Sequence, residues 1–154
     1  MRRIVVLGGT GFFGSVAVEL LRAEGVEAVV ASRGTGTDAG DRDSLRRTLR
    51  KGDVVLDAAG PYQARTESLV EAAIEIGFDV VDLSDSGAYA RRLMALRSRI
   101  DAAGVRVLTS CSTVSTFTAA AIRMSGIANP SKVALFLVPS TAHTANRGVM
   151  HSLL

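Results

Sequence analysis

The sequence predicts an α/β protein in which a doubly wound parallel sheet is covered by helices on both faces. Two observations carry this prediction. Short runs rich in valine alternate along the chain with segments whose apolar residues recur at helical spacing. The strand-like runs are nearly continuous in apolar residues, which is typical of parallel strands that are buried on both faces. The length of 154 residues favours one main domain.

The first part of the chain has the pattern of strand, glycine turn, helix and strand. Ile4 to Leu7 is a short β-branched run that predicts a buried strand. From Phe12 to Glu24 the apolar residues recur at helical spacing, and Gly25 ends the predicted helix. Val26 to Ala31 predicts the second strand.

The stretch SRGTGTDAGDRD, which follows the second strand, is irregular. It contains three glycines and no apolar run long enough for a good third strand. Two readings stay open: a very short strand around Thr37 to Ala39, or a loop in its place. The helix expected before such a strand is missing. A short basic helix follows over Asp43 to Lys51, with Asp43 as its predicted N-cap.

The rest of the chain repeats the alternation of strands and helices. Strands are expected over 53–58, 79–83, 105–109 and 132–138, and helices over 66–76, 88–103 and 116–124. Asn129-Pro130 breaks the chain before the last of these strands, and the residues after it have no core to join. We therefore expect residues 1–125 to form one domain and residues 126–154 to begin a second, α+β domain that is truncated.

The glycines near the N-terminus form the pattern G-x-G-x-x-G, directly after a strand and directly before a helix. In this context the first glycine permits a tight turn, the second lets the backbone approach a pyrophosphate, and the third lets helix and strand pack closely. The amides and the positive dipole at the helix N-terminus then bind the phosphates. The alternative is a glycine-rich turn without a ligand. A P-loop is excluded, because no Gly-Lys-Ser/Thr follows.

The end of the second strand predicts the type of nucleotide. An NAD site would place Asp or Glu there, whereas this chain has Ser32 and Arg33. Arg33 can pair with a 2′-phosphate and Ser32 can donate a hydrogen bond to it, so NADP is favoured over NAD. The alternative reading of Arg33 is a solvated residue at the end of a strand.

Other candidate residues lie where later strands end, which is where ligands of open α/β sheets bind. In Asp57 to Tyr62 (DAAGPY), small residues let a cofactor approach, and Tyr62 faces either the nicotinamide side or the following helix. Asp82 and Asp85 face a substrate cation or cap the next helix. The expected nucleotide contacts are Gly9, Thr10, Gly11, Phe12, Phe13, Gly14, Ser32, Arg33, Ala59, Gly60, Pro61 and Tyr62.

No catalytic group and no metal site can be assigned from the sequence. The Tyr-x-x-x-Lys dyad of short-chain dehydrogenases is missing, because Leu93 stands four residues after Tyr89. Cys111 cannot be paired with His143 or His151 from sequence, and a lone Cys at a strand end is usually a small buried apolar residue. The two histidines lack metal-ligand spacing.

Composition and charge exclude several other classes of protein. The net charge of +3 comes from scattered arginines, and aromatic residues are only 5% of the chain, so we expect no nucleic-acid binding. The uncharged run from Ile4 to Val18 carries four glycines, unlike the helical core of a signal peptide. The later run from Val107 to Ile122 is too short for a membrane span. The single cysteine gives no sign of an oxidising compartment, and the cytoplasm is expected.

The stretches GGTGFFG, DAAGPYQ, VVDLSDS and CSTVSTFTAAA, in this order and spacing, resemble the NADP-binding Rossmann domain of the saccharopine dehydrogenase-like family. The resemblance implies a reductase or dehydrogenase that holds a small-molecule substrate between this domain and a second one. It is compatible with a homodimer formed through the second domain. A rival of another class is a non-catalytic NADP-binding redox sensor similar to NmrA-like regulators, and a third is a structural domain that binds no nucleotide.

Overall fold

The computed structural model describes residues 2–134 and contains a five-stranded sheet in the order β2-β1-β3-β4-β5. The strands are β1 (Ile4–Leu7), β2 (Ala28–Ala31), β3 (Val54–Asp57), β4 (Asp79–Asp82) and β5 (Val107–Leu108). All neighbouring strands are parallel, so their carboxyl ends share one edge of the sheet. The predicted doubly wound α/β fold is confirmed.

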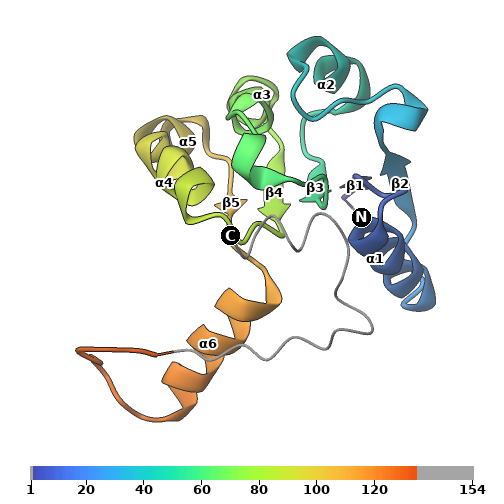
Figure 1. Ribbon diagram of the computed structural model, residues 1–154. Coiled ribbons are helices and arrows are strands. Elements are labelled where there is room, and N and C mark those ends of the chain that lie inside the picture. Colours follow the sequence, from blue (N-terminus) through green and yellow to red (C-terminus); the bar gives the residue numbers. More distant parts are fainter. Residues whose placement is uncertain (1, 135–154) are drawn as a thin grey trace.

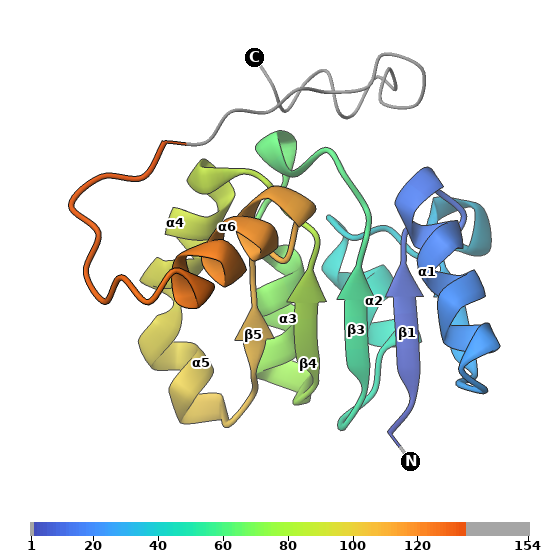
Figure 2. The same cartoon turned by 90° about the horizontal axis from the view of Figure 1, so that it is seen from below.

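The helices form a layer on each side of this sheet (Figure 1). They are α1 (Phe12–Ala23), α2 (Arg42–Thr48), α3 (Ser68–Ile76), α4 (Gly87–Ala95), α5 (Arg97–Ala103) and α6 (Thr113–Met124), with the short 3-10 helices η1 (Arg33–Thr35) and η2 (Tyr62–Ala64). Helices α2 to α5 cover one face and α1 packs on the other, whereas α6 lies on the same side as α1 but extends away from the sheet (Figure 1 and Figure 2). The connections between strands therefore run over both faces of the sheet. From β1 the strand order proceeds outward in opposite directions, to β2 on one side and to β3 on the other, so the topological switch point lies between β1 and β3.

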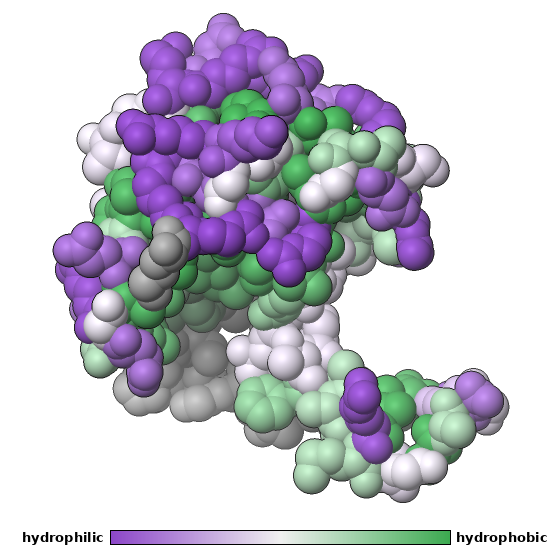
Figure 3. Space-filling model, turned by 180° about the vertical axis from the view of Figure 1, so that it is seen from behind, coloured by the Kyte–Doolittle hydropathy of each residue, from purple (hydrophilic) through white to green (hydrophobic). Residues whose placement is uncertain are grey.

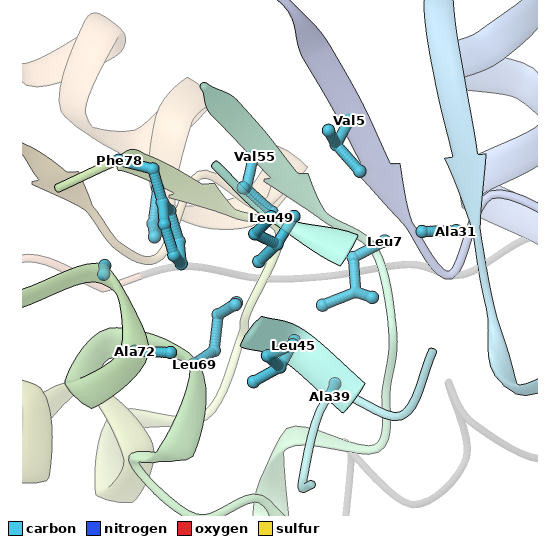
Figure 4. Packing of buried hydrophobic residues seen from close by; sticks show 12 residues of the cluster. Val5, Leu7, Ala31, Ala39, Leu45, Leu49, Val55, Leu69, Ala72 and Phe78 are labelled. Atoms are coloured by element: carbon cyan, nitrogen blue, oxygen red, sulfur yellow. The ribbon is translucent and has the colours of Figure 1, made fainter. Parts of the chain in front are cut away.

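The main hydrophobic core lies between the sheet and the layer that contains α2 and α3 (Figure 4). Alternate strand residues point into it, because successive side chains of a strand face opposite sides of the sheet. Leu7 of β1, Leu45 of α2, Leu69 of α3 and Phe78 are all 0% exposed. Burial of each such side chain stabilises the fold by about 1.5–3 kcal/mol, which fixes the strand ends that carry the site.

The segment between β2 and α2 differs from the sequence prediction at the N-cap of α2. It also shows whether a short third strand or a loop follows β2. Residues 32–41 contain η1 and turns, so a loop replaces the third strand in this part of the described chain. Gly36, with φ +86°, supplies the left-handed turn that ends η1. The N-cap of α2 is Asp41 and not Asp43: its carboxylate accepts hydrogen bonds from the amides of Asp43 and Ser44.

The helix predicted over 88–103 is divided at Leu96. Leu96 ends α4 and begins α5 with φ −89° and ψ 0°, and no proline or glycine marks the division. The bend lets Leu96 and Ile100 pack on a second buried cluster around Tyr62 and Tyr89, so tertiary packing determines the break. The predicted strand over 132–138 lies mainly outside the described residues, and residues 132–134 have no regular structure.

Helix α1 buries a different face from the one that its apolar residues suggest. Gly14 and Val18 are its buried positions, whereas Val16 and Leu20 are exposed. Close contact of α1 with the sheet depends on small or branched side chains, and the larger ones point outward. Helix α6 extends from the rest of the domain as an arm with apolar atoms at its surface (Figure 3).

Candidate functional site

The turn between β1 and α1 is built almost entirely from backbone contacts. The Gly8 amide donates to the carbonyl of Ala31 at 2.7 Å, and the Gly11 amide donates to the carbonyl of Gly8 at 2.8 Å. Gly11 caps α1 without a side-chain hydrogen bond. The first amides of the helix, which have no partner within it, are thus offered to a ligand at the positive end of the dipole.

Several of the glycines in this turn have no room for a side chain. A Cβ on Gly14 would overlap the carbonyl group of Gly8, which is the close helix-to-strand packing expected of the third glycine of the motif. A Cβ on Gly8 would lie 2.8 Å from the backbone of Ala58 and Ala59. The turn is therefore pressed between its own helix and the loop after β3.

The end of β2 places two polar side chains at this turn. Ser32 is only 7% exposed, and its hydroxyl oxygen is buried without a hydrogen-bond partner in the described structure. Its amide donates to the Thr35 hydroxyl at 2.8 Å, which holds η1 against the strand. Arg33 is exposed and begins η1. The end of β2 thus carries a buried hydroxyl without a partner next in sequence to an exposed guanidinium.

The loop that replaces the third strand is fastened to α2. The hydroxyl groups of Thr37 and Thr48 lie 2.9 Å apart, and the Asp38 amide donates to the hydroxyl of Ser44 at 2.9 Å. The Ser44 hydroxyl in turn donates to the Asp38 carbonyl at 3.0 Å. These bonds make a fixed wall opposite the glycine turn.

A buried ion pair closes the site at the end of β3. The guanidinium of Arg65 meets the carboxylate of Asp57 with Nη2 2.9 Å from Oδ2 and Nη1 3.3 Å from Oδ1. The same Nη1 donates to the carbonyl of Ala59, and the Ala59 amide donates to Asp57 Oδ1 at 3.0 Å. The Tyr62 hydroxyl donates to the Asp57 carbonyl at 2.6 Å.

Burial controls the electrostatics of this ion pair. Burial raises the pKa of Asp57, and the charge of Arg65 and the Ala59 amide counteract only part of that effect. Burial also lowers the pKa of Arg65, but the charge of Asp57 and the hydrogen bond to it raise this pKa by more. The pKa of Tyr62 is raised, first by burial and then by the nearby carboxylates, so the phenol stays protonated.

The glycine turn, the loop after β2 and the loop after β3 line a half-open cavity of about 490 Å³, within the range of small-molecule sites. Seven of the predicted contact residues line it: Thr10, Gly11, Ser32, Arg33, Ala59, Gly60 and Pro61. The lining also includes Ala58, which belongs to the predicted DAAGPY stretch, and residues that the sequence analysis missed: Leu7, Gly8, Gly34, Thr37, Asp38, Ala39, Ala64 and Arg65. The missed residues of the outer wall belong to the irregular loop, and Arg65 follows the DAAGPY stretch by three residues.

The remaining predicted contacts lie beside the cavity and do not line it. Gly9 and Gly14 shape the turn. Phe12 and Phe13 begin α1, where these residues are 62% and 53% exposed. Tyr62 points into the protein, where it is 7% exposed and packs on Tyr89 with ring centroids 5.7 Å apart. The structure therefore shows the packing role that the sequence left open for Tyr62.

The two aspartates after β4 have separate roles. Asp82 is 0% exposed, and its Oδ1 accepts hydrogen bonds from the amides of Ser84 and Ser110, both at 3.0 Å. It thereby ties together the loops that follow β4 and β5. Asp85 is exposed, and the N-cap of α4 is Ser86, so neither aspartate caps that helix.

The other chemistry-bearing residues do not form a second centre among the residues described. Burial raises the pKa of the Cys111 thiol, which opposes nucleophilic activation. His143 and His151 lie outside the described residues. Within residues 2–134, no group of three His, Cys, Asp or Glu side chains could hold a metal ion. In the same region, no helix is long and apolar enough to cross a membrane.

A larger open hollow of about 710 Å³ lies beside β5, α4 and α5. Its lining is mostly apolar and includes Leu93, Ile100 and Leu108. It shares no residue with the glycine turn, so we place the candidate site in the smaller cavity.

The smaller cavity has the donor groups that NADP requires. The glycine turn leaves backbone space and helix amides for the pyrophosphate. Ser32, whose buried hydroxyl has no partner, and Arg33 together suit a 2′-phosphate. These residues fit the nucleotide that the sequence predicts.

Comparison with known proteins agrees with this geometry. Residues 35–108 match the model of the saccharopine dehydrogenase NADP binding domain. The predicted resemblance to this family is thus confirmed over residues 35–108. NADP, the predicted cofactor, is the nucleotide in that family's description. The match begins after the glycine turn, so it depends on the later strands and loops, among them the wall formed by residues 58–65.

Two curated relatives extend the comparison. The chain is 31% identical to a lipid droplet localized protein of Caenorhabditis elegans, over 70% of this chain and 32% of the relative. It is 28% identical to a probable mitochondrial saccharopine dehydrogenase-like oxidoreductase of Arabidopsis thaliana, over 48% of this chain and 16% of the relative. The matched region thus spans less than a third of either relative.

Solved structures are similar at a lower level. UDP-N-acetylglucosamine 4-epimerase from Bacillus cereus has 16% identity and a TM-score of 0.46, over 70% of this chain and 58% of the epimerase. A small-chain dehydrogenase in complex with NADPH has 19% identity and a TM-score of 0.40, over 66% of this chain and 62% of the dehydrogenase.

Proposed function

We propose that this chain binds NADP in the cavity between the ends of β1, β2 and β3 and serves an oxidoreductase that transfers hydride to or from a small molecule. The observation that carries the proposal is the pairing of the buried, unpartnered Ser32 hydroxyl with exposed Arg33 beside the glycine turn. A 2′-phosphate would complete the hydrogen bonding of Ser32 and pair with Arg33.

Each wall of the cavity has its own part in this function. The glycine turn and the N-terminus of α1 would hold the pyrophosphate, and Ala59, Gly60 and Pro61 would flank the nicotinamide half. The bound cofactor supplies the hydride, so the chain contributes mainly binding, orientation and exclusion of water. Residues 126–154 would begin a second domain that contributes to substrate binding and to a homodimer.

The composition of the chain is the basis for our proposal on compartment and partners. We place the protein in the cytoplasm, without nucleic-acid or membrane partners, because the lone cysteine and the scattered arginines give no other indication. The names of the two curated relatives refer to lipid droplets and to mitochondria. Fluorescence microscopy of the tagged protein together with markers of these organelles tests the assignment, and colocalisation with either organelle would contradict it.

Calorimetric titration with NADPH and NADH under identical salt tests the nucleotide. We expect clear preference for NADPH. The substitution Arg33→Asp should weaken NADPH binding about 10-fold to 100-fold, the loss expected for charge-assisted hydrogen bonds of about 1.5–3 kcal/mol. NADH binding should change by about 3-fold or less, since it lacks the phosphate with which Arg33 pairs. Arg22→Asp, an exposed arginine of α1 outside the cavity, is the matched control.

Two results would contradict this assignment. Equal losses for NADPH and NADH in Arg33→Asp would show that Arg33 does not read the 2′-phosphate. Absence of binding by a well-folded wild-type chain would contradict the cofactor site itself.

A second candidate function is a non-catalytic NADP-dependent sensor. Its support is that the described lining of the cavity contains no Tyr, His, Cys or Lys, and that its one carboxylate, Asp38, accepts a hydrogen bond from the Gly40 amide at 2.8 Å within its own loop. Steady-state oxidation of NADPH by the protein with imine or carbonyl substrates would exclude the sensor. Binding of NADPH without turnover, together with NADPH-dependent capture of a partner, would favour it.

A further inference from the structure

Arg65 occupies an unusual position for an arginine. Its side chain is only 9% exposed, and the carboxylate that it meets, Asp57, is 0% exposed. A buried ion pair gives up the hydration of two charges, and its net contribution to stability is often small. The role of this ion pair is therefore better inferred from the part of the structure that it holds in place than from its contribution to stability.

The pair fixes the backbone of the loop that follows β3. Both backbone groups of Ala59 are bound: its amide donates to Asp57, and its carbonyl accepts from Arg65. Tyr62 strengthens the arrangement, because its hydroxyl donates to the Asp57 carbonyl and its ring lies 5.8 Å from the Arg65 guanidinium carbon. The loop is held at its start, its middle and its end.

This loop is also one wall of the cavity. Ala58, Ala59, Gly60 and Pro61 line it, and none of them has a polar side-chain group with which to hold itself in place. The backbone of Ala58 and Ala59 would lie 2.8 Å from a Cβ on Gly8, so the wall is seated directly against the glycine turn. A shift of the loop would therefore change the width of the cavity beside the turn.

We propose that Arg65 is a positioning residue for the nicotinamide half of the bound nucleotide, and that it acts by holding the 58–61 wall through Asp57 and Ala59. The inference rests on the proposed function. On this proposal, binding at the two parts of the cavity, the 2′-phosphate part and the nicotinamide part, depends on different arginines. Arg33 serves the phosphate at the end of β2, and Arg65 serves the wall at the end of β3.

A comparison of two ligands tests this separation. NADPH fills both parts, whereas adenosine 2′,5′-bisphosphate has the phosphate-bearing adenosine and lacks the nicotinamide half. Arg65→Met should weaken NADPH binding at least about 10-fold, as expected when hydrogen bonds to charged groups that hold a wall are lost. Binding of the bisphosphate should stay within about 3-fold, because the interactions of its phosphate are intact. Arg65→Lys keeps the positive charge but cannot form the two parallel hydrogen bonds of a guanidinium to a carboxylate, so it should recover only part of the affinity.

Two further variants control for folding. Arg97→Met replaces an arginine whose side chain is 75% exposed and should leave both ligands unaffected. The double variant Asp57→Asn with Arg65→Met removes the buried charge that Arg65→Met alone would leave unpaired. We expect it to fold and still to lose NADPH affinity selectively, which keeps the test valid if the single variant unfolds.

The outcomes separate this inference from the proposed function. Loss of both ligands to the same extent, or of neither, in a folded Arg65 variant would overturn the positioning role and leave the NADP site standing. If the wild-type chain binds neither ligand, the proposed function fails first and the positioning role fails with it.

Discussion

The carboxylate of Asp79 offers a stringent test of the electrostatic reasoning. Asp79 begins β4, and its side chain is 13% exposed. Its Oδ2 accepts from Arg2 and Arg106, each at 2.7 Å, and its Oδ1 accepts from the Arg106 amide at 2.8 Å. Burial raises the pKa of Asp79, but these hydrogen bonds outweigh burial and lower the pKa to about 2.

The magnitude follows from linkage between protonation and folding. A fall in pKa from 3.8 to about 2 corresponds to about 2 kcal/mol of stability at neutral pH. Both arginines are well exposed, so solvent screening reduces this to about 1 kcal/mol. Because the folded-state pKa is the lower one, the contribution is present above pH 3.8 and is lost as the pH falls from 3.8 towards 2.

Urea unfolding of the wild type and of Asp79→Asn measures this contribution. We expect the variant to be about 1 kcal/mol less stable at pH 7 and the difference to shrink between pH 4 and pH 2. Asp101→Asn, at an exposed pair with Arg97 in α5, should change stability by less than about 0.5 kcal/mol. Equal stability of wild type and Asp79→Asn at pH 7, or a difference that does not depend on pH, would refute the reasoning.

Two further substitutions test local features of the fold. Gly14→Ala should destabilise the chain by about 1–3 kcal/mol and weaken NADPH binding, because the added methyl group overlaps the Gly8 carbonyl. Thermal unfolding and calorimetry measure both effects. Gly87→Ala, at the start of α4, where a Cβ would lie 3.6 Å from the Arg91 guanidinium, an ordinary contact, should not lower the melting temperature. Asp41→Ala should cost about 0.5–2 kcal/mol as the N-cap of α2. Asp43→Ala should cost less in the same urea unfolding experiment, and the reverse order would contradict the cap assignment.

The parts of the fold that local pattern determines were predictable from the sequence. The valine-rich runs gave β1, β3 and β4 within two residues at each end, and the glycine pattern identified the turn before α1. The division of the helix at Leu96 was not predictable, since no residue there breaks a helix by itself. It results from contacts with Tyr62 and Tyr89, which are distant in the sequence.

The candidate site shows the same division between local and distant information. Ser32 and Arg33 were predictable because the position after the second strand has a defined place in this architecture. The inward direction of Tyr62 was left open, because it depends on a hydrogen bond to the Asp57 carbonyl. Arg65 was missed, because an arginine is ordinarily exposed and its buried partner becomes apparent only in three dimensions.

The loop that takes the place of the third strand connects the cavity to a helix that does not line it. A strand would be held by its neighbours in the sheet, whereas this wall is held by the hydroxyl groups of Ser44 and Thr48 in α2. Fraying of α2 would release the wall, so occupancy of the cavity and order in this seven-residue helix should be coupled. Surface substitutions on α2 would then alter nucleotide affinity from a distance, and the nucleotide would in turn protect the amides of α2 from hydrogen exchange.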